Sequence, residues 1–203
     1  MRSLLRRLFG GAAPVAIRSA RWVVIDCEAS GLDPARDRLL SVGAVAVHDA
    51  RVELADSFHA VLRQETPSSA ENILVHRIGA DAQRAGRPAQ EALGAFRRYL
   101  GGGLPVAFHA DFDSRLLDMP GPWLDLARLA PALYPERART HRALDDWLQA
   151  FGVAAPERHD ALADAYATAQ LLLVLLAEAE RQRALTAGEL HRISRAAGWL
   201  GAR

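Results

Sequence analysis

The sequence contains very little cysteine. Of its 203 residues only Cys27 is a cysteine, so an intramolecular disulfide and a zinc site built from cysteine thiolates are both excluded. We therefore expect any metal ion to be bound by oxygen and nitrogen ligands. A single thiol is also typical of proteins in the reducing cytoplasm, and we predict that location.

Long apolar runs and an excess of one charge are missing as well. The longest apolar run covers residues 171–177 and is far too short to span a bilayer, so we expect a soluble protein without a membrane partner. Half of the residues are hydrophobic, 24% are charged and the net charge is +1. These values exclude a disordered acidic or basic chain and favour one globular domain of ordinary size.

The first twenty residues lack acidic side chains but contain four arginines, namely Arg2, Arg6, Arg7 and Arg18. Arginines and a glycine pair interrupt the apolar stretch, which argues against a secretory signal. We expect residues 1–20 to form a flexible or weakly helical basic arm that touches phosphates. The alternative is a solvated terminus without a role.

Short β-rich runs precede long helical patterns along the rest of the chain, which is typical of an α/β domain. The pattern predicts five strands, at residues 22–26, 39–47, 52–62, 104–108 and 123–125. The second and third are separated by a polar turn and are expected to form an antiparallel pair. Helical spacing predicts short pieces within 68–84 and helices over 89–100, 112–117, 126–133, 141–151 and 160–181, with a last short helix after 186.

The first predicted strand delivers two acids to one place. Side chains alternate across a strand, so Asp26 and Glu28 share one face roughly 6 to 7 Å apart, while Cys27 points to the other face. Ionised acids are rarely buried without a partner, so a positive charge is expected between them. No nearby basic group would activate the Cys27 thiol, and we interpret Cys27 as a packing residue.

Two further clusters of acids follow the same logic. Asp111 and Asp113 come directly after the predicted strand at 104–108, at a strand-to-helix junction where ligands collect in open α/β sheets. His159 and Asp164 flank the start of the long C-terminal helix. The helix dipole favours acids in a first turn, but Asp164 also lies next to the apolar side of this helix. A purely structural role explains it poorly.

Four acids gathered at neutral pH would repel one another strongly, and bound divalent cations with oxygen ligands are the ordinary resolution. We therefore predict two Mg²⁺ or Mn²⁺ ions. Such a pair is the usual device for in-line attack on a phosphodiester. A nearby histidine can then take the proton of the attacking water.

The three clusters together resemble the DEDD superfamily of 3′-to-5′ exonucleases. The similarity is to its DEDDh branch, which includes the proofreading epsilon subunit of bacterial DNA polymerase III. The family motifs D-x-E-T-T-G, H-N-A-x-F-D and H-x-A-x-x-D correspond to residues 26–31, 108–113 and 159–164. His159, five residues before the last acid, is typical of this branch. The resemblance covers roughly residues 21–181.

The resemblance implies a ribonuclease H-like α/β fold with a central mixed five-stranded sheet flanked by helices. It also implies roles for five residues. Asp26 would bridge both metal ions, while Glu28 and Asp164 would hold the ion on the side of the nucleophile. Asp113 would hold the other ion mostly through water, and His159 would be the general base.

The motifs depart from the family pattern at positions that face the nucleotide. Ala29 and Ser30 replace two threonines, and His109 stands where the family usually has asparagine. We predict all three as substrate contacts, with Ala29 and Ser30 acting through backbone N–H groups of their turn.

Other acids compete for the role of metal ligand. Asp111 is the alternative to Asp113 in the second motif, but the phenylalanine directly before Asp113 fits the family pattern and favours Asp113. Asp118 and Asp125 are interpreted as structural or solvated residues.

The resemblance divides the chain into a basic arm over 1–20, an exonuclease domain over 21–182 and a C-terminal helical tail over 183–203. The expected activity is metal-dependent 3′-5′ hydrolysis at the 3′ end of single-stranded DNA, which releases nucleoside monophosphates. A single-stranded 3′ end is the expected partner, and a DNA polymerase is a further candidate. The oligomeric state stays open.

Three alternatives are compatible with parts of the sequence. A 3′-5′ exoribonuclease or oligoribonuclease that trims RNA would use the same catalytic residues. A non-catalytic, polymerase-associated module that binds nucleic acid would keep the fold, although it would not need all five positions filled. An HD-type phosphohydrolase, suggested by the pair His159-Asp160, would be all-helical, which the valine-rich strands argue against.

Overall fold

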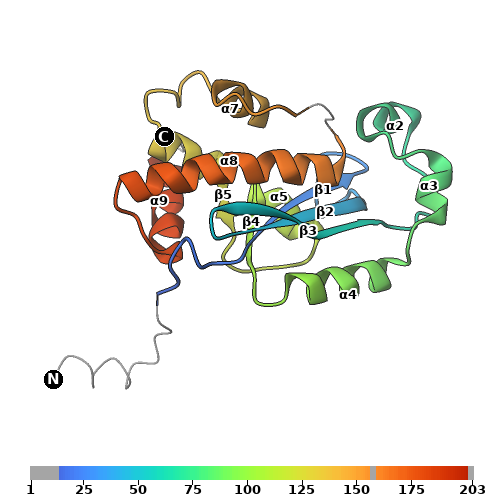
Figure 1. Ribbon diagram of the computed structural model, residues 1–203. Helices are drawn as coiled ribbons and strands as arrows, with labels where there is room; N and C mark the ends of the chain where they lie inside the picture. The colour runs from blue at the N-terminus through green and yellow to red at the C-terminus, as the bar shows by residue number, and fades with distance from the viewer. Residues whose placement is uncertain (1–13, 156–158, 201–203) are drawn as a thin grey trace.

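A mixed five-stranded sheet forms the centre of the protein (Figure 1). The computed structural model describes residues 14–155 and 159–200. The strands lie in the order β3-β2-β1-β4-β5. The pairs β3–β2 and β2–β1 are antiparallel, and the pairs β1–β4 and β4–β5 are parallel. The strands are β1 (Trp22–Ala29), β2 (Leu39–His48), β3 (Arg51–Val61), β4 (Leu104–Ala107) and β5 (Leu124–Asp125).

Helices flank this sheet on both faces, with α8 across one face and α4 across the other (Figure 1). The predicted ribonuclease H-like α/β fold is confirmed, and the sheet excludes an all-helical HD-type phosphohydrolase. The helices are α2 (Ala70–His76), α3 (Ala80–Ala85), α4 (Ala89–Leu100), α5 (Ala110–Leu116), α6 (Leu126–Leu133), α7 (Leu144–Ala150), α8 (Ala161–Arg181) and α9 (Ala187–Leu200).

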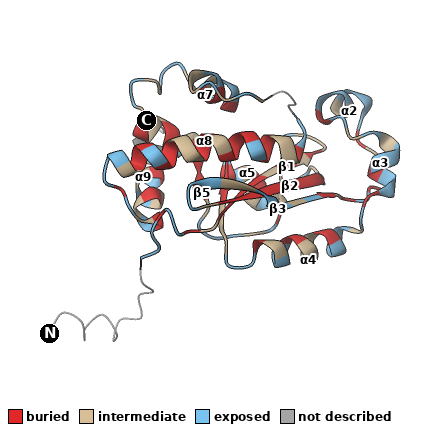
Figure 2. Cartoon of the chain, in the orientation of Figure 1, coloured by how far each residue is buried: buried red, intermediate tan, exposed pale blue. Residues whose placement is uncertain are grey.

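The central strand β1 is buried on both faces (Figure 2). Trp22 and Val24 belong to the core layer under α8, whereas Val23 and Ile25 belong to the layer that α4 covers. A strand covered on both sides needs apolar residues at every position, which explains its continuous apolar run. The pairing with β2 continues past Asp26 to the end of β1, so the acids lie within a strand that is longer than predicted.

Strand β2 and helix α8 approach each other closely at Gly43. A Cβ atom at this position would lie 2.2 Å from the carbonyl carbon of Ala161 and 2.3 Å from the backbone nitrogen of Leu162. The missing side chain therefore lets the first turn of α8 lie directly on the sheet. Gly43 is paired with Asp26, so this contact brings the start of α8 to the acidic end of β1.

Two helices begin at residues other than those predicted. Helix α7 begins at Leu144 and not at residue 141, because the Asp146 carboxylate accepts hydrogen bonds of 2.8 Å from the backbone N–H groups of Arg142 and Ala143. A carboxylate that binds these donors stops the helix from starting earlier. Helix α5 begins two residues early, because His109 turns the chain directly from β4 into the helix.

Both ends of the described chain pack onto the domain. Residues 1–13 of the predicted arm lie outside the described residues, whereas Ile17 and Ala20 are buried in the core. The backbone N–H of Ile17 donates to the carbonyl of Leu185 at 3.0 Å, and Leu190 of α9 is buried in the same core layer. The division into arm, exonuclease domain and tail stays a prediction, but the described parts of both end segments contribute to the core.

Within the described residues, α8 is the one helix with the length and apolar composition of a membrane span. However, 61% of its most apolar window is buried inside the protein, where α8 packs on β1, β2 and β3. Burial of this extent is typical of the core helix of a globular domain.

Candidate active site

All five residues predicted to act in catalysis line one cavity at the carboxyl end of β1. The cavity has a volume of about 530 Å³. The five residues come from three separate parts of the chain, and they are Asp26, Glu28, Asp113, His159 and Asp164. The structure therefore brings together the three clusters that the sequence predicts.

The two acids of β1 are half-buried and continue the face of Trp22 and Val24, which α8 covers. One ligand atom each from Glu28, His159 and Asp164 lie within 4.8 Å of one another. Groups at this separation are close enough to bind a common cation.

Asp164 is positioned by the first turn of α8 and is only 4% exposed. Its Oδ2 atom accepts a hydrogen bond of 2.9 Å from the backbone N–H of His159. His159 itself is exposed and has a left-handed φ of 64°. Asp160 caps α8, since its carboxylate accepts bonds of 3.1 and 2.9 Å from two backbone N–H groups of the first turn.

Asp113 lies on α5 and is 4% exposed. Burial raises the pKa of its carboxyl to about 7, although the Cys27 thiol and the backbone N–H groups of both residues counteract this by hydrogen bonding. The charge of Asp125 adds to the increase. A carboxyl that is costly to ionise in the protein alone becomes easy to ionise when a cation binds beside it.

Cys27 is buried, as predicted, and its thiol faces Asp113. Burial raises the pKa of the thiol well above its usual value, and the charge of Asp113 raises it further. A buried, protonated thiol is a poor nucleophile, so Cys27 has no chemical role of its own. The sequence does not indicate its contact with Asp113, because no local pattern relates β1 to α5.

Of the predicted substrate contacts, Ala29 is the last residue of β1 and Ser30 begins the turn that follows. The backbone N–H of Ser30 donates to the carbonyl of Arg38 and its hydroxyl donates to Asp37, both at 2.9 Å. The carbonyl of Ala29 accepts a 3.2 Å hydrogen bond from the side-chain amide of Asn72 on α2. Neither residue lines the cavity, and the Ser30 N–H is already bonded to Arg38, so the substrate contacts stay a prediction.

The two acids of the second motif have different positions. Asp113 lines the cavity and Asp111 does not. The Asp111 side chain is 71% exposed and forms an ion pair with Arg128. His109, the third predicted substrate contact, lies at the wall of the cavity.

Sequence reasoning missed two residues of β2 that lie beside the acids. Ser41 is paired with Glu28, and Gly43 is paired with Asp26. The buried hydroxyl of Ser41 has no hydrogen-bond partner among the described residues. Neither Ser41 nor Gly43 lines the catalytic cavity, so both belong to the strand that supports the acids. The available signal was a serine and a glycine inside a valine-rich strand.

Comparison with known sequences connects this cavity to a family of nucleases. The family model for RNase_T exonucleases matches residues 23–172. The DNA polymerase III PolC-type proteins of Thermotoga petrophila and Bacillus subtilis are 29% and 30% identical over 168 and 179 residues, which cover 78% and 83% of this chain. The match covers 12% of either relative, so the chain spans about an eighth of their length.

Solved structures show the same fold. Exonuclease X, in complex with 5′ overhanging duplex DNA, has a TM-score of 0.69 and 26% identity, and the match covers 85% of this chain and 99% of that one. The nuclease domain of 3′hExo, a DEDDh family member bound to rAMP, also has a TM-score of 0.69, with 15% identity over 81% of this chain and 95% of that one.

These matches confirm the resemblance that the three motifs carry. Exonucleases of this family generally use divalent metals, and the carboxylates and histidine around the cavity are donors of a suitable kind. The chain belongs to the RNase_T exonuclease family and is a DnaQ-like 3′-5′ exonuclease.

Proposed function

We propose that the chain is a metal-dependent exonuclease that removes nucleoside monophosphates from the 3′ end of single-stranded DNA. One observation carries this proposal, namely the convergence of four carboxylates and a histidine on one cavity. Asp26, Glu28, Asp113 and Asp164 would hold two Mg²⁺ or Mn²⁺ ions. When bound, such ions activate a water and stabilise the leaving oxygen.

His159 would act as the general base by accepting the proton of the attacking water at a ring nitrogen. The hydrogen bond from its backbone to Asp164 holds the histidine next to the buried acids. The exposure of His159 then gives the proton a path to solvent. Asp164 thus serves both as a ligand and as the support of the base.

Apolar side chains at the cavity would pack against the bases of the terminal nucleotides. Leu32 lines the cavity and is 92% exposed, and Phe108 and Phe112 form partly buried parts of its wall. Packing against a base face is tolerant of sequence, so the enzyme would degrade strands of any sequence.

The relatives favour DNA as the substrate. Exonuclease X is similar along nearly its whole chain and was solved with DNA, and the similar PolC-type proteins are DNA polymerases. On the same grounds we propose a DNA polymerase as a partner and the cytoplasm as the location.

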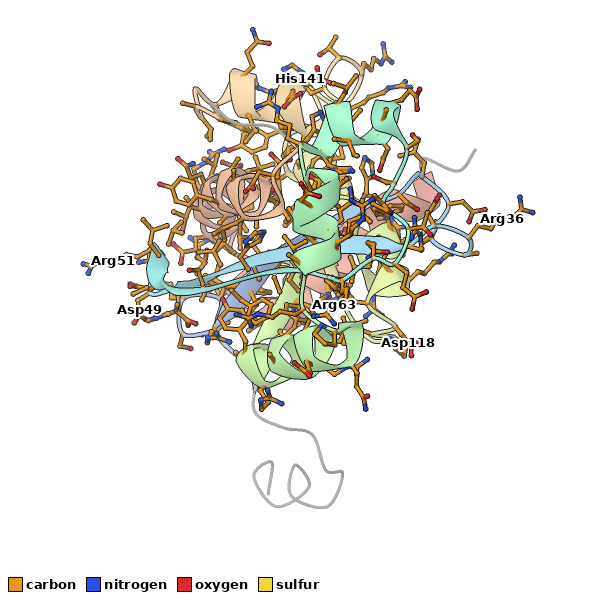
Figure 3. The ribbon with its side chains drawn as sticks, turned by 90° about the vertical axis from the view of Figure 1, so that its right-hand side faces the viewer. Arg36, Asp49, Arg51, Arg63, Asp118 and His141 are labelled. Atoms are coloured by element: carbon orange, nitrogen blue, oxygen red, sulfur yellow. The ribbon has the colours of Figure 1, made fainter. Side chains whose placement is uncertain are left out.

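The test compares Asp26→Asn with Asp49→Asn in the full chain. Asp49 is a suitable control because it lies in the turn between β2 and β3. Arg36, in the loop between β1 and β2, lies at the opposite end of the sheet (Figure 3). With Mn²⁺ and a labelled single strand, we expect Asp26→Asn to reduce mononucleotide release by roughly 10³-fold or more. The control should match the wild type.

Three results would contradict the proposal. Wild-type activity in Asp26→Asn would remove this residue from the mechanism. A wild-type protein that binds single strands but releases no mononucleotide would be a binding module. Faster cleavage of a matched RNA strand would identify an RNA-trimming enzyme.

A further inference from the structure

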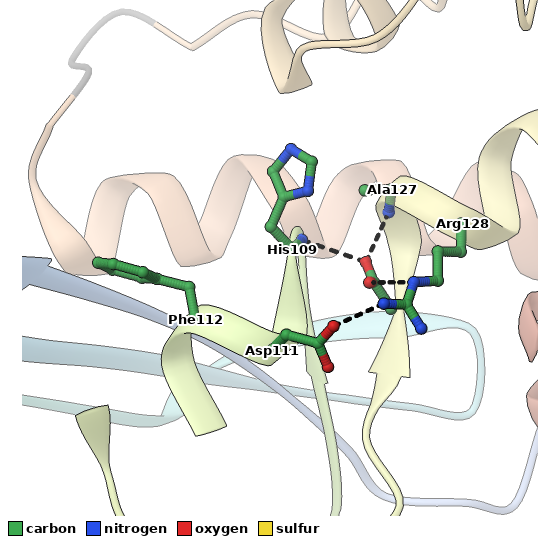
Figure 4. A pocket seen from close by; sticks show the side chains of 6 residues that line it. His109, Asp111, Phe112, Ala127 and Arg128 are labelled. Atoms are coloured by element: carbon green, nitrogen blue, oxygen red, sulfur yellow. Dashed lines mark hydrogen bonds and ion pairs between the residues drawn. The ribbon is translucent and has the colours of Figure 1, made fainter. Parts of the chain in front are cut away.

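A second cavity of about 310 Å³ adjoins the catalytic cavity. Figure 4 shows the side chains that line this second cavity. His109 and Phe112 line both cavities, so the two share a wall. Asp125 lines the second cavity but not the catalytic one, and it comes from the short strand β5, where it is paired with Ala107 of β4. Its side chain is 9% exposed, and carboxylates are rarely so buried unless they are paired.

Both carboxylate oxygens of Asp125 have partners (Figure 4). Oδ1 accepts hydrogen bonds from the backbone N–H groups of His109 at 3.1 Å and Ala127 at 3.0 Å. Oδ2 lies 3.2 Å from Nε of Arg128, and Nη2 of Arg128 donates to Asp111 at 2.5 Å. We call these contacts the Asp125 clamp. The clamp joins the turn between β4 and α5 to the start of α6.

The turn at His109 needs such support. His109 has φ 67° and ψ 51°, a left-handed conformation that residues with a Cβ atom adopt rarely. It is also the N-cap residue of α5, yet its side chain makes no capping hydrogen bond. Strained backbone persists where surrounding contacts determine it, and the bond from the His109 N–H to Asp125 is such a contact.

The conformation of this turn sets the position of two side chains of the catalytic cavity. The His109 ring lies at the wall between the cavities, and Asp113 follows four residues later on α5. A helix moves as a rigid rod, so a shift at its first residue would displace Asp113. Asp125 does not itself line the catalytic cavity, and any effect on the reaction passes through His109.

Arg128 belongs to this support and not to a site for phosphate. Its guanidinium is already paired with the carboxylates of Asp111 and Asp125. Two negative charges therefore offset its single positive charge, which leaves no excess that would attract an anion.

We propose that Asp125 is a positioning residue of the exonuclease reaction. By accepting the N–H of His109 it holds the turn between β4 and α5, and thereby Asp113, in the geometry of the catalytic cavity. The kinetic part of this proposal rests on the proposed function.

The test compares Asp125→Ala with Asp125→Asn in the full chain. The alanine variant loses every contact of the side chain, whereas the asparagine variant keeps an oxygen that accepts from His109 and Ala127. We expect Asp125→Ala to lower kcat about 10- to 100-fold, with KM within about threefold of the wild type. Asp125→Asn should recover most of kcat.

A second readout uses neither metal nor substrate. Hydrogen exchange at the His109 amide should become about tenfold faster or more in Asp125→Ala and stay near the wild-type rate in Asp125→Asn. The control is Glu189→Ala, which removes a carboxylate that accepts 2.9 Å bonds from the backbone N–H groups of Leu185 and Thr186 before α9. Like Asp125→Ala, Glu189→Ala loses a carboxylate that accepts backbone N–H groups at the start of a helix. Its kcat and its rate of hydrogen exchange at the His109 amide should nevertheless equal those of the wild type.

The outcomes separate the two proposals. If Asp125→Ala keeps the kcat and the His109 exchange of the wild type, Asp125 has no positioning role. If Asp125→Ala does not fold, Asp125→Asn alone decides. A folded Asp125→Asn whose kcat is about 10- to 100-fold below that of the wild type would overturn the proposal. A wild-type protein without nuclease activity would refute the proposed function, while the exchange experiment would still test the clamp.

Discussion

The catalytic cavity has two unlike sides. On one side, the carboxylates of Asp113 and Asp164 are each 4% exposed and belong to helices that pack on the sheet. By contrast, His159 is exposed and stands in the loop before α8, where its backbone N–H donates to Asp164. The acids are thus positioned by packing, and the histidine is positioned by an acid.

This difference matches the two kinds of chemistry that we assign to the sides. Ligands of a pair of cations must stay within a fraction of an ångström of fixed positions, which rigid elements provide. A group that gains and loses a proton in each cycle must exchange it with solvent, which exposure provides.

The largest expected effect tests this division directly. Asp164→Asn should weaken Mn²⁺ binding at least about tenfold and reduce mononucleotide release roughly 10³-fold, because it removes a ligand and weakens the support of His159. His159→Ala should reduce release about 10²-fold or more but leave the Mn²⁺ affinity within about threefold. Calorimetric titration with Mn²⁺ and a release assay measure the two quantities. If His159→Ala weakens Mn²⁺ binding as much as Asp164→Asn, the histidine is a ligand and the division is wrong.

The rigid side depends on the close contact between Gly43 and α8. Gly43→Ala places a Cβ atom 2.2 Å from backbone atoms of Ala161, so α8 must move away from the sheet and carry Asp164 with it. We expect a loss of about 3 kcal/mol in the free energy of unfolding, measured by urea denaturation, together with lower activity.

Gly102→Ala is the matched control for this substitution. A Cβ atom at Gly102 meets nothing within 4 Å, and the change should alter the stability by less than about 0.5 kcal/mol. Equal stability of the Gly43→Ala and Gly102→Ala variants would show that α8 does not need the glycine.

Local periodicity indicated three acids of the site, whereas Asp113 was preferred to Asp111 because of its match to the family motif. Alternation along β1 placed Asp26 and Glu28 on one face, and the apolar stripe of α8 left Asp164 beside the buried side of the helix. Helices α4 and α6 have the predicted bounds. Gly101 follows the last residue of α4, and Asp125 caps the first turn of α6.

Contacts between distant segments were not predictable from these patterns. Asp125 was interpreted as structural or solvated, and the structure places it in the clamp beneath His109. The contact of Cys27 with Asp113 and the approach of α8 to Gly43 likewise join separate parts of the chain. Periodicity reports which face of an element is buried, but it does not report what lies opposite.

A smaller effect concerns the stability of the protein without metal. The folded state raises the pKa of Asp113 from 3.8 to about 7, so between these pH values the folded state binds more protons than the unfolded state. The contribution of Asp113 to stability is therefore lost as the pH rises through this window.

Asp113→Asn should remove this pH dependence and stabilise the metal-free protein at pH 8 by on the order of 2 kcal/mol. Thermal unfolding in the presence of a chelator, at pH 5 and pH 8, measures the effect. Added Mn²⁺ should stabilise the wild type more than the variant, because a bound ligand stabilises only the state that binds it. A variant with the same pH dependence as the wild type would show that Asp113 is already ionised without a cation.

The smallest expected effect comes from Asp111, two residues from Asp113 on the same helix. Its side chain is 71% exposed and its pairing with Arg128 lies at the surface, where such pairs contribute little to stability. Asp111→Asn should therefore keep mononucleotide release within about threefold of the wild type, whereas Asp113→Asn should abolish it. A release assay on both variants is sufficient. If both variants lost mononucleotide release equally, burial would not distinguish Asp113 from Asp111. The metal ligand of the second motif would then be unassigned.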